Sequence, residues 1–512
     1  MTQAEALAIL ESGQSVLLTG AAGTGKTYVL NQFIRRARAS GKNVAVTATT
    51  GLAATHLNGT TIHAWSGIGV RDLIDEGFFH KMSKQRTDLI NKADILIIDE
   101  VSMLHDFRLD MVEEITHSVR GGERPFGGLQ VILCGDFFQL PPINRRDNRQ
   151  GSFVTGSQTW KNGAFTVCYL EEQFRQSEDN AYGAILNGIR AGQLTRSQLE
   201  ALQQRSEGVA SPFTTRTRLL TINVDVDAIN AEHLEDLKEK NYEYKMETSG
   251  RKQYIETLMR SCLAPETLNL KRGALVMCIK NSQDRKYVNG SLGIVEDFEP
   301  YTNYPVVKLT NNKEITIKPE SWELMDGDKR RATVTQLPLR LAWAITVHKS
   351  QGMTLDAAQI DLSKAFVEGM GYVALSRVRG LKYLILDGLN GMALRTSPLA
   401  RQLDIELRAR SQTTRQEYKD VIDDWHKREE LRKNEPEKPV KTGKSWAEKL
   451  EKMREEYPNA YRPWAEAEDV KLVKLFAGDV SVKSLSKMMG RHPGSIRARL
   501  KKHFGEDVVF KK

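Results

Sequence analysis

The sequence predicts an α/β protein built on parallel sheets, followed by a β-rich insertion and a small all-helical module. Short apolar strands alternate with helical segments through the first 170 residues, and a glycine-rich turn follows the first strand directly. Between about 232 and 338 the pattern changes to β-like runs, and helical segments dominate near the end. Strand–helix alternation is typical of a parallel sheet covered by helices on both faces, with its ligand at the carboxyl ends of the strands.

The composition indicates a globular chain of several domains, because 512 residues are too many for one core. Hydrophobic residues make up 40% and charged residues 27%, as in ordinary globular proteins. The four cysteines form no C-x-x-C pair, which favours buried thiols in a reducing compartment over a zinc site or disulfides. No apolar run is long enough to span a membrane and Met1–Leu10 lacks a basic start, so we expect a cytoplasmic protein without a membrane partner.

The positive charge is concentrated at the end of the chain. From Val470 onward there are 11 Lys and Arg against 3 Asp and Glu, so eight of the nine net charges lie there. This end is typical of a segment that binds a polyanion. In the nearly neutral remainder, contacts with nucleic acid must come from the local placement of charge.

The first strand, predicted over Ser15–Thr19, leads into a phosphate-binding loop. Gly20-Ala-Ala-Gly23-Thr-Gly25-Lys26-Thr27 fits G-x-x-x-x-G-K-[ST] at every fixed position, and a helix is predicted over Tyr28–Ala39. Glycine lets the backbone N–H groups turn inward around phosphate oxygens, and the helix N-terminus adds a partial positive charge. Lys26 is then placed for the β- and γ-phosphates of a nucleoside triphosphate, and the Thr27 hydroxyl for Mg²⁺. A glycine-rich turn that binds nothing is disfavoured by this context.

The next strands end in polar residues suited to phosphate chemistry. Asp99 is placed for the Mg²⁺ shell, and Glu100 for orienting and deprotonating the attacking water. The alternative is that the pair only caps a helix beginning near Ser102. Gln139 follows another strand and suits a γ-phosphate sensor, whereas Asp136 also fits a simple turn. The strands are predicted over Asn43–Thr49, Asp94–Asp99, Leu129–Cys134 and Phe165–Leu170.

Together these motifs resemble superfamily 1 helicases, and Pro125–Gln130 resembles the signature of the Pif1-like family of superfamily 1B. The resemblance covers roughly Met1–Gly388. It implies two RecA-like domains that close over ATP and Mg²⁺ and move 5′→3′ along single-stranded DNA. It also places Gln3 as an adenine-reading glutamine. The motifs are Gly20–Thr27, Thr47–Ala54, Thr61–His63, Asp99–Ser102 and Gly135–Pro142.

Two arginines of the second domain lie in further motifs of this resemblance. Leu170–Gln176 resembles motif IV and Gly371–Arg379 resembles motif VI, which implies that Arg175 and Arg377 are arginine fingers. Such fingers accelerate phosphoryl transfer by about 10³–10⁵. The expected catalytic set is Lys26, Asp99, Glu100, Gln139, Arg175 and Arg377. The expected nucleotide-binding set is Gln3, Gly20, Gly23, Thr24, Gly25, Lys26, Thr27, Arg175 and Arg377, and Thr27 and Asp99 are expected to hold the metal.

The resemblance also implies a face for single-stranded DNA. Small hydroxyl residues bond phosphates without reading sequence, and an imidazole can stack on a base. His63 by itself would more often be a structural histidine. In the insertion Gly67–Lys92, Phe78 is expected to belong to a strand-separating wedge, with packing onto the core as the alternative. The remaining predicted DNA contacts are Thr47, Thr49, Thr50, Gly51, Thr61, Thr221, Asn223 and, in a segment resembling motif V, Thr346, His348, Lys349, Ser350 and Gln351.

The expected domains follow from these patterns together with the resemblance, which implies the RecA-like and SH3-like assignments. They are a first RecA-like domain over 1–170 with an insertion at about 67–92, and a second over 171–400 with an SH3-like β-barrel at about 232–338. A charged helical or flexible linker over 401–461 and a three-helix module over 462–508 complete the chain. Strands of the barrel are predicted over Ala274–Lys280, Ser291–Phe298, Val306–Leu309 and Glu314–Lys318, and the parallel sheet resumes at Gln359–Leu362 and Tyr383–Asp387.

The last module resembles a Myb/SANT or helix-turn-helix unit. Arg497 and Lys501 share one face of its third helix by their i,i+4 spacing, and that helix is expected to lie on DNA. A basic bundle that contacts another protein is the alternative.

The function expected from the sequence is therefore an ATP-dependent 5′→3′ DNA helicase acting on single-stranded DNA, on junctions and on structured DNA such as G-quadruplexes. We expect it to be monomeric when free, with replication or recombination proteins as partners. The alternatives are a RecD-like recombination helicase subunit and an ATP-switched DNA-binding protein without processive unwinding.

Overall fold

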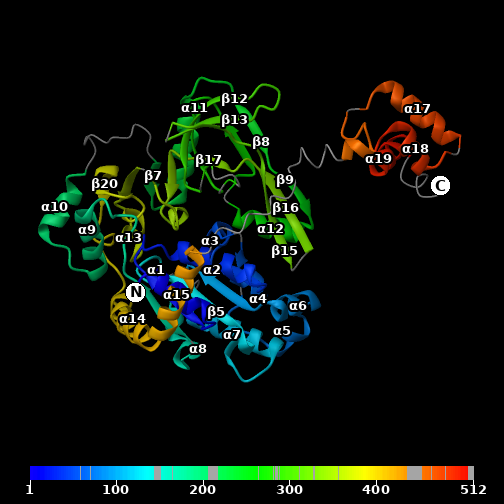
Figure 1. Ribbon diagram of the computed structural model, residues 1–512. Coiled ribbons are helices and arrows are strands. Elements are labelled where there is room, and N and C mark those ends of the chain that lie inside the picture. The colour runs from blue at the N-terminus through cyan, green and yellow to red at the C-terminus, as the bar shows by residue number, and fades with distance from the viewer. Residues whose placement is uncertain are drawn as a thin grey trace. The chain divides into compact units, whose positions relative to one another are not determined.

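The computed structural model describes residues 1–142, 151–205, 217–434 and 453–504, apart from positions 58, 70, 164, 263, 281, 283–285, 288, 311, 327, 328, 356, 463 and 479. The chain forms two compact units, Met1–His426 and Lys427–Lys512, whose elements are labelled in Figure 1. Across the described ranges, no helix has the length and apolar character needed to cross a bilayer.

A six-stranded parallel sheet organises the first part of the larger unit. Its strand order is β3-β2-β4-β5-β1-β6, and every pairing is parallel. All residues of the three central strands are buried, because helices cover both faces. The strands are β1 (Val16–Gly20), β2 (Val44–Ala48), β3 (Thr60–Thr61), β4 (Ile95–Asp99), β5 (Gln130–Gly135) and β6 (Thr166–Leu170). The five predicted strands are confirmed, and only the two-residue β3 was not predicted.

The helices of this part are mostly short, and several begin at hydroxyl caps. Helix α1 starts at a capping box formed by Thr2 and Glu5, which satisfies two backbone N–H groups reciprocally. The helices are α1 (Gln3–Glu11), α2 (Lys26–Ala39), α3 (Gly51–His56), α4 (Ile62–Ser66), α5 (Glu76–His80), α6 (Lys84–Lys92), α7 (Asp106–Arg120) and α8 (Gln158–Lys161), with 3₁₀ turns η1 (Val101–Met103), η2 (Pro125–Gly128) and η3 (Val154–Gly156).

A second, four-stranded parallel sheet has the order β18-β7-β19-β20. Its strands are β7 (Thr217–Leu220), β18 (Ala344–Thr346), β19 (Ala358–Leu362) and β20 (Leu384–Leu389). The accompanying elements are α9 (Asn180–Ala191), α10 (Arg196–Gln203), α11 (Asn223–Asp236), η4 (His348–Ser350), α13 (Met370–Leu375) and η5 (Leu381–Tyr383). Two parallel sheets with flanking helices confirm the predicted α/β fold class.

The insertion between β7 and β18 is antiparallel. A five-stranded sheet has the order β14-β13-β12-β11-β17, beside a three-stranded sheet β15-β16-β9 and a pair β10-β8. All four predicted strands lie in the five-stranded sheet. The region, for which the sequence pattern indicated β-like runs, also contains a helix, α12, which packs Leu258 against Trp322 and Val334. The elements are β8 (Tyr242–Lys245), β9 (Glu247–Gly250), α12 (Lys252–Ser261), β10 (Thr267–Leu270), β11 (Leu275–Cys278), β12 (Leu292–Phe298), β13 (Pro305–Leu309), β14 (Glu314–Thr316), β15 (Glu320–Asp326), β16 (Lys329–Gln336) and β17 (Leu339–Leu341).

The region predicted as a charged linker is partly a structural element of the larger unit. Helix α14 (Pro398–Glu417) buries Leu403 and Leu407, and α15 (Lys419–Asn434) buries Trp425. The indole Nε1 of Trp425 donates to Glu11 Oε2 at 2.7 Å. The high charge density of these helices belongs to their outer faces, which is why composition alone suggested a linker. Residues 435–452 of the predicted linker lie outside the described part of the chain.

The four cysteines are free, as the sequence predicts. Cys134, Cys168 and Cys278 are buried and Cys262 is half-buried. Burial raises the pKa of Cys168 and of Cys278 to about 12, and that of Cys262 to about 11. Among the described residues, no group of three or more His, Cys, Asp or Glu is arranged to hold a metal ion.

The smaller unit contains the three predicted helices, α17 (Glu466–Ala477), α18 (Val482–Met489) and α19 (Pro493–Phe504). Their apolar faces meet in one core that includes Leu472, Phe476, Leu485, Ile496 and Leu500. Helix α18 ends at Gly490, whose φ of +58° is the left-handed conformation that glycine adopts readily at a helix end.

Replacing Trp425 with Ala should lower the free energy of unfolding of the larger unit by about 3 kcal/mol, because the change leaves a cavity and removes the hydrogen bond to Glu11. Urea unfolding followed by circular dichroism measures this loss. Ile405→Ala on α14, where the side chain is 72% exposed, is the matched control and should change stability by less than about 0.5 kcal/mol. Equal effects of the two substitutions would contradict the packing of α15.

Candidate nucleotide site and nucleic-acid face

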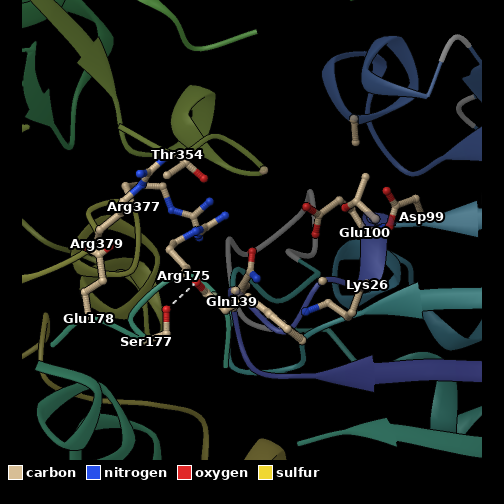
Figure 2. A pocket seen from close by; sticks show the side chains of 17 residues that line it. Lys26, Asp99, Glu100, Gln139, Arg175, Ser177, Glu178, Thr354, Arg377 and Arg379 are labelled. Atoms are coloured by element: carbon tan, nitrogen blue, oxygen red, sulfur yellow. Dashed lines mark hydrogen bonds between the residues drawn. The ribbon is translucent and has the colours of Figure 1, made fainter. Parts of the chain in front are cut away.

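A cavity of about 520 Å³ lies where the two parallel sheets face each other, at the carboxyl ends of β1, β4 and β5. Figure 2 shows Lys26, Asp99 and Glu100 on one side and Arg175, Arg377 and Arg379 on the other, with Gln139 between them. The phosphate loop and the residues after β4 and β5 supply the first side, and the second sheet's connections supply the other. The lining residues are Ala22, Gly23, Gly25, Lys26, Thr27, Ala53, Asp99, Glu100, Gln139, Phe174, Arg175, Ser177, Glu178, Gly352, Thr354, Arg377 and Arg379.

The phosphate loop requires glycine because other chain segments approach it closely. Gly25 has a φ of +82°, and a Cβ there would lie 2.0 Å from Gln3 Nε2. A Cβ on Gly23, whose φ is +91°, would lie 2.7 Å from Arg175 Cβ. The Gln3 amide donates to the Thr24 carbonyl at 3.0 Å, so in this structure the predicted adenine-reading glutamine braces the loop.

Lys26 and Thr27 begin α2 and line the cavity. Lys26 Nζ donates to the carbonyls of Gly20 and Ala21 at 2.9 and 3.0 Å, so the side chain folds back onto the phosphate loop. A triphosphate would compete with these two carbonyls for the ammonium group. Thr24 is buried and its hydroxyl donates to Ala21 at 2.9 Å, which fits a role in holding the loop.

The acidic pair lies at the end of β4. Glu100 N donates to Asp99 Oδ1 at 2.9 Å, and Glu100 adopts a left-handed conformation with a φ of +52°. Burial, and then the Asp99 carboxylate, raises the pKa of Glu100 to about 7. A carboxylate with that pKa is suited to accepting a proton near neutral pH. Glu100 precedes η1 but makes no capping hydrogen bond, so the alternative role as a helix cap has no support.

Asp99 and Thr27 offer a carboxylate and a hydroxyl oxygen to the same cavity, which is the oxygen donor set that Mg²⁺ prefers. Burial raises the pKa of Asp99. A bound cation would act in the opposite direction by favouring the ionised form. The residues therefore fit the metal that the sequence implies.

Gln139 is buried beneath the cavity with one polar atom unsatisfied. Its Oε1 has no hydrogen-bond partner within the described residues, although buried amide oxygens nearly always have one. A ligand or an ordered water in the cavity would supply the missing partner, which fits the predicted role near the γ-phosphate.

The two predicted finger arginines hold backbone oxygens of the second domain. Arg175 Nη1 donates to the Ser376 carbonyl at 2.9 Å, and Arg377 donates to the carbonyls of Val373 and Met353 at 2.7 and 3.2 Å. Burial, followed by the charge of Arg377, lowers the pKa of Arg175 to about 9. Two like charges beside one cavity, with Arg377 buried and Arg175 half-buried, favour an anionic occupant, which would relieve their repulsion.

Several predicted DNA contacts are used for internal bonds instead. The hydroxyls of Thr47 and Ser350 are buried and donate to the carbonyls of Ile97 and Val347, so in this structure neither hydroxyl is exposed for a contact with DNA. Thr49 donates to Glu100 O at 2.9 Å. Both Thr221 and Thr346 are buried as well. In these cases the sequence signal was a hydroxyl at a strand end, which fits either role.

The remaining predicted contacts lie closer to the surface. Thr50 and Thr61 accept hydrogen bonds from Ala53 N and Ala64 N at 3.2 and 3.1 Å, and Gly51 begins α3. In the motif V segment the exposed His348 ring lies 6.2 Å from that of Phe366, and Lys349 is half-buried. His63 is half-buried on α4. The Asn223 side chain lies outside the described part.

Gln351 is buried rather than exposed to solvent. Its Nε2 donates to Glu100 Oε2 at 2.9 Å. The segment predicted to grip DNA therefore touches the predicted catalytic base directly.

Phe78 is not available as a wedge. It is only 8% exposed, its ring packs edge-on against Phe79 at 5.5 Å, and it belongs to the main core. Packing onto the core, the alternative considered for this residue, is what the structure contains. Among the described residues of the insertion, Leu73 is the most exposed large apolar side chain, at 82%.

Sequence reasoning missed a set of polar residues behind the cavity. Asp136, considered above as a turn residue, is buried against Arg190 of α9, and Gln173 donates to the Ala22 carbonyl at 3.0 Å. An arginine within an otherwise apolar helix face (Ile185, Leu186, Ile189) was the available signal for Arg190.

Comparison with known proteins gives a consistent result along most of the chain. The family model "PIF1-like helicase" matches residues 2–198, and the model "DNA helicase Pif1, 2B domain" matches residues 253–298. The ATP-dependent DNA helicase Pif1 of Psychrobacter sp. (strain PRwf-1) is 39% identical over 481 residues, which cover 82% of this chain and 73% of that protein. The ATP-dependent DNA helicase PIF1 of Xenopus laevis is 35% identical over 424 residues, covering 80% of this chain and 65% of that one.

A solved structure resembles the fold as well. The crystal structure of Pif1 helicase from Bacteroides in complex with ADP-AlF3 and ssDNA has a TM-score of 0.57 and 32% sequence identity. The match covers 81% of this chain and 99% of that one.

Replacing Lys26 with Ala should reduce nucleoside triphosphate turnover by about 10²–10³, since the ammonium group lies at the phosphate loop, where it can neutralise phosphate charge. Affinity for single-stranded DNA should stay within a few-fold of the parent value, as measured by fluorescence anisotropy. Arg38→Ala, an exposed cation on the same helix, is the control and should leave turnover unchanged. Normal turnover by the Lys26 variant would contradict the assignment of the cavity as the nucleotide site.

Proposed function

Because the chain belongs to the PIF1-like helicase family, we propose that it is an ATP-dependent DNA helicase that moves 5′→3′ on single-stranded DNA and separates duplex or structured DNA. The observation that carries the proposal is the convergence of Lys26, Glu100 and Gln139 from one parallel-sheet domain and Arg175 and Arg377 from the other on a single cavity. The catalytic set of such an enzyme is complete only when both domains contribute residues to the cavity.

Hydrolysis follows from the positions of these groups. The oxygen of a water held near Glu100 attacks the γ-phosphorus, the bond to the β–γ bridging oxygen breaks, and the water proton passes to the Glu100 carboxylate. Lys26 neutralises charge on the β- and γ-phosphates, and Arg175 and Arg377 do so from the opposite side. When bound at Thr27 and Asp99, Mg²⁺ would supply further neutralisation of the phosphate oxygens.

Movement along DNA requires that ATP hydrolysis change the contacts between the protein and DNA. Gln351 contacts Glu100, while His348 and Lys349 of the same segment lie nearer the surface and are suited to base stacking and phosphate contact. Arg377 also donates to Met353, two residues after Gln351. The motif V segment thus joins both sides of the ATP cleft to the DNA face, which favours a translocase over an ATP-switched DNA-binding protein.

The physiological setting is part of the same proposal. The Bacteroides Pif1 complex contains ssDNA, and the chain retains Pro125–Gln130 of the Pif1-like signature, which favours this family over a RecD-like subunit. We expect a cytoplasmic protein, monomeric when free, that acts at junctions or structured DNA such as G-quadruplexes alongside replication or recombination proteins.

The smaller unit adds a second DNA contact to this proposal. Its acidic residues Glu468 and Asp469 are each paired with an arginine, Arg491 and Arg499, within the three-helix core. Exposed cations remain on α18 and α19, namely Lys483, Lys487, Arg497 and Lys502. This arrangement supports a helix-turn-helix-like unit that places α19 on duplex DNA.

Strand-separation assays test the motor function. We expect unwinding of a duplex with a 5′ single-stranded tail, no unwinding of the matched duplex with a 3′ tail, and ATP turnover that rises at least about tenfold with single-stranded DNA. ATP hydrolysis without unwinding of either duplex would favour the switch, and a preference for the 3′ tail would contradict the direction.

The smaller unit can be tested through the salt dependence of duplex binding. Replacing Arg497 and Lys501 together with Gln should reduce the slope of log K against log salt by about 1.8, as expected for the loss of two phosphate contacts. The control exchanges Lys471 and Lys474, which are exposed on α17, and should leave the slope unchanged. An unchanged slope in the first variant would favour the protein-contact alternative.

A further inference from the structure

The hydroxyl of Tyr372 lies at a buried junction between the two parallel-sheet domains and the phosphate loop. It accepts hydrogen bonds from Ala22 N and Arg190 Nη1, both at 3.0 Å, and donates to Asp136 Oδ2 at 3.1 Å. One donor and two acceptor positions are all that a tyrosine hydroxyl has, so each is used. Tyr372 belongs to α13, Arg190 to α9, and Asp136 follows β5.

The Tyr372 hydroxyl is held by an ion pair that water does not reach. Arg190 Nη1 donates to Asp136 Oδ1 at 2.8 Å, and both side chains are almost fully buried. The Arg190 guanidinium also lies 4.0 Å from the centre of the Phe138 ring. Burial alone would raise the pKa of Asp136, but the charges of Arg190 and Lys26 outweigh it and hold that pKa below its ordinary value.

The same residue of the phosphate loop is held from its other side. The Ala22 carbonyl accepts from Gln173 Nε2 at 3.0 Å. Gln173 precedes Arg175 by two residues, and Tyr372 precedes Arg377 by five. Arg175 also donates to the carbonyl of Ser376, next to Arg377. Both arginine-bearing segments are therefore tied to Ala22 and to each other.

We propose that Tyr372 and Gln173 are positioning residues that align Arg175 and Arg377 with the phosphate loop through the backbone N–H and C=O of Ala22. Neither side chain needs to touch the substrate. When ATP draws the loop around its phosphates, Ala22 moves both arginine-bearing segments with it, so that the fingers reach the γ-phosphate together. The Asp136–Arg190 pair fixes the position of the Tyr372 hydroxyl through its two hydrogen bonds. This inference rests on the proposed ATPase function.

Tyr372→Phe removes only the hydroxyl and is the direct test. We expect kcat for DNA-stimulated ATP hydrolysis to fall about tenfold, as for the loss of one or two buried hydrogen bonds in the transition state. KM for ATP and the affinity for single-stranded DNA should stay within about twofold of the parent values. A fall in kcat without a change in KM distinguishes a positioning role from general loss of structure.

Tyr182→Phe is the matched control. Tyr182 is buried, and its hydroxyl donates to the Leu375 carbonyl of the same helix α13 at 2.6 Å rather than to the phosphate loop. It should keep a normal kcat at a comparable melting temperature. An equal fall in kcat for both tyrosine variants would mean that α13 only needs its packing intact, and would overturn the proposal.

A double-variant cycle with Gln173→Met gives a second readout. Because both residues act through Ala22, we expect the combined fall in kcat to be at least about threefold smaller than the product of the single effects. Multiplicative effects, or a Tyr372→Phe enzyme that hydrolyses ATP like the parent, would overturn the inference. If the parent enzyme hydrolysed ATP at the same rate with and without DNA, that result would instead overturn the proposed function. The two failures are therefore distinguishable.

Discussion

The buried Arg190–Asp136 ion pair is the contact on which the geometry of the cleft depends. It joins an arginine of the second domain to Asp136, which directly follows the central strand β5 of the first sheet. A buried charge that loses its partner is strongly unfavourable, so the two domains stay in contact behind the cavity. Tyr169, Asp404 and Arg408 extend the same polar network toward α14. At the front of the cavity, by contrast, Arg175 and Arg377 donate to backbone carbonyls and, for Arg377, to the Ser376 hydroxyl, and these hydrogen bonds include no acidic partner.

Much of the fold could be predicted because its signals are local. Strands of the first sheet appear as short apolar runs, and their bounds were predicted to within one residue at nearly every end. The phosphate loop, Asp99 and Glu100 each follow such a strand, and parallel strands place their carboxyl ends at one edge. For the same reason Lys26, Asp99 and Glu100 are found in one cavity, although the sequence alone could not show Gln351 touching Glu100.

The remaining features depend on partners far away in the sequence. A threonine at a strand end looks the same whether its hydroxyl faces DNA or, like that of Thr47, a carbonyl of the neighbouring strand. Phe78 was expected in a wedge because the family resemblance implies one in its insertion, yet its side chain packs in the core. Asp136 lies where a turn residue is expected, but its carboxylate pairs with Arg190, which is 54 residues away in the sequence. The segment that forms α14 and α15 was predicted as a linker because it contains few apolar residues. Those few are nevertheless enough to anchor both helices.

The cysteines have a practical consequence for watching this enzyme at work. Maleimide dyes react with thiolates, and burial keeps three of the four thiols out of reach and all four protonated at neutral pH. A single cysteine introduced at an exposed position such as Ser40 would therefore be labelled selectively in the otherwise native chain. Fluorescent tracking of individual molecules on stretched nucleic acid then needs no cysteine-free background.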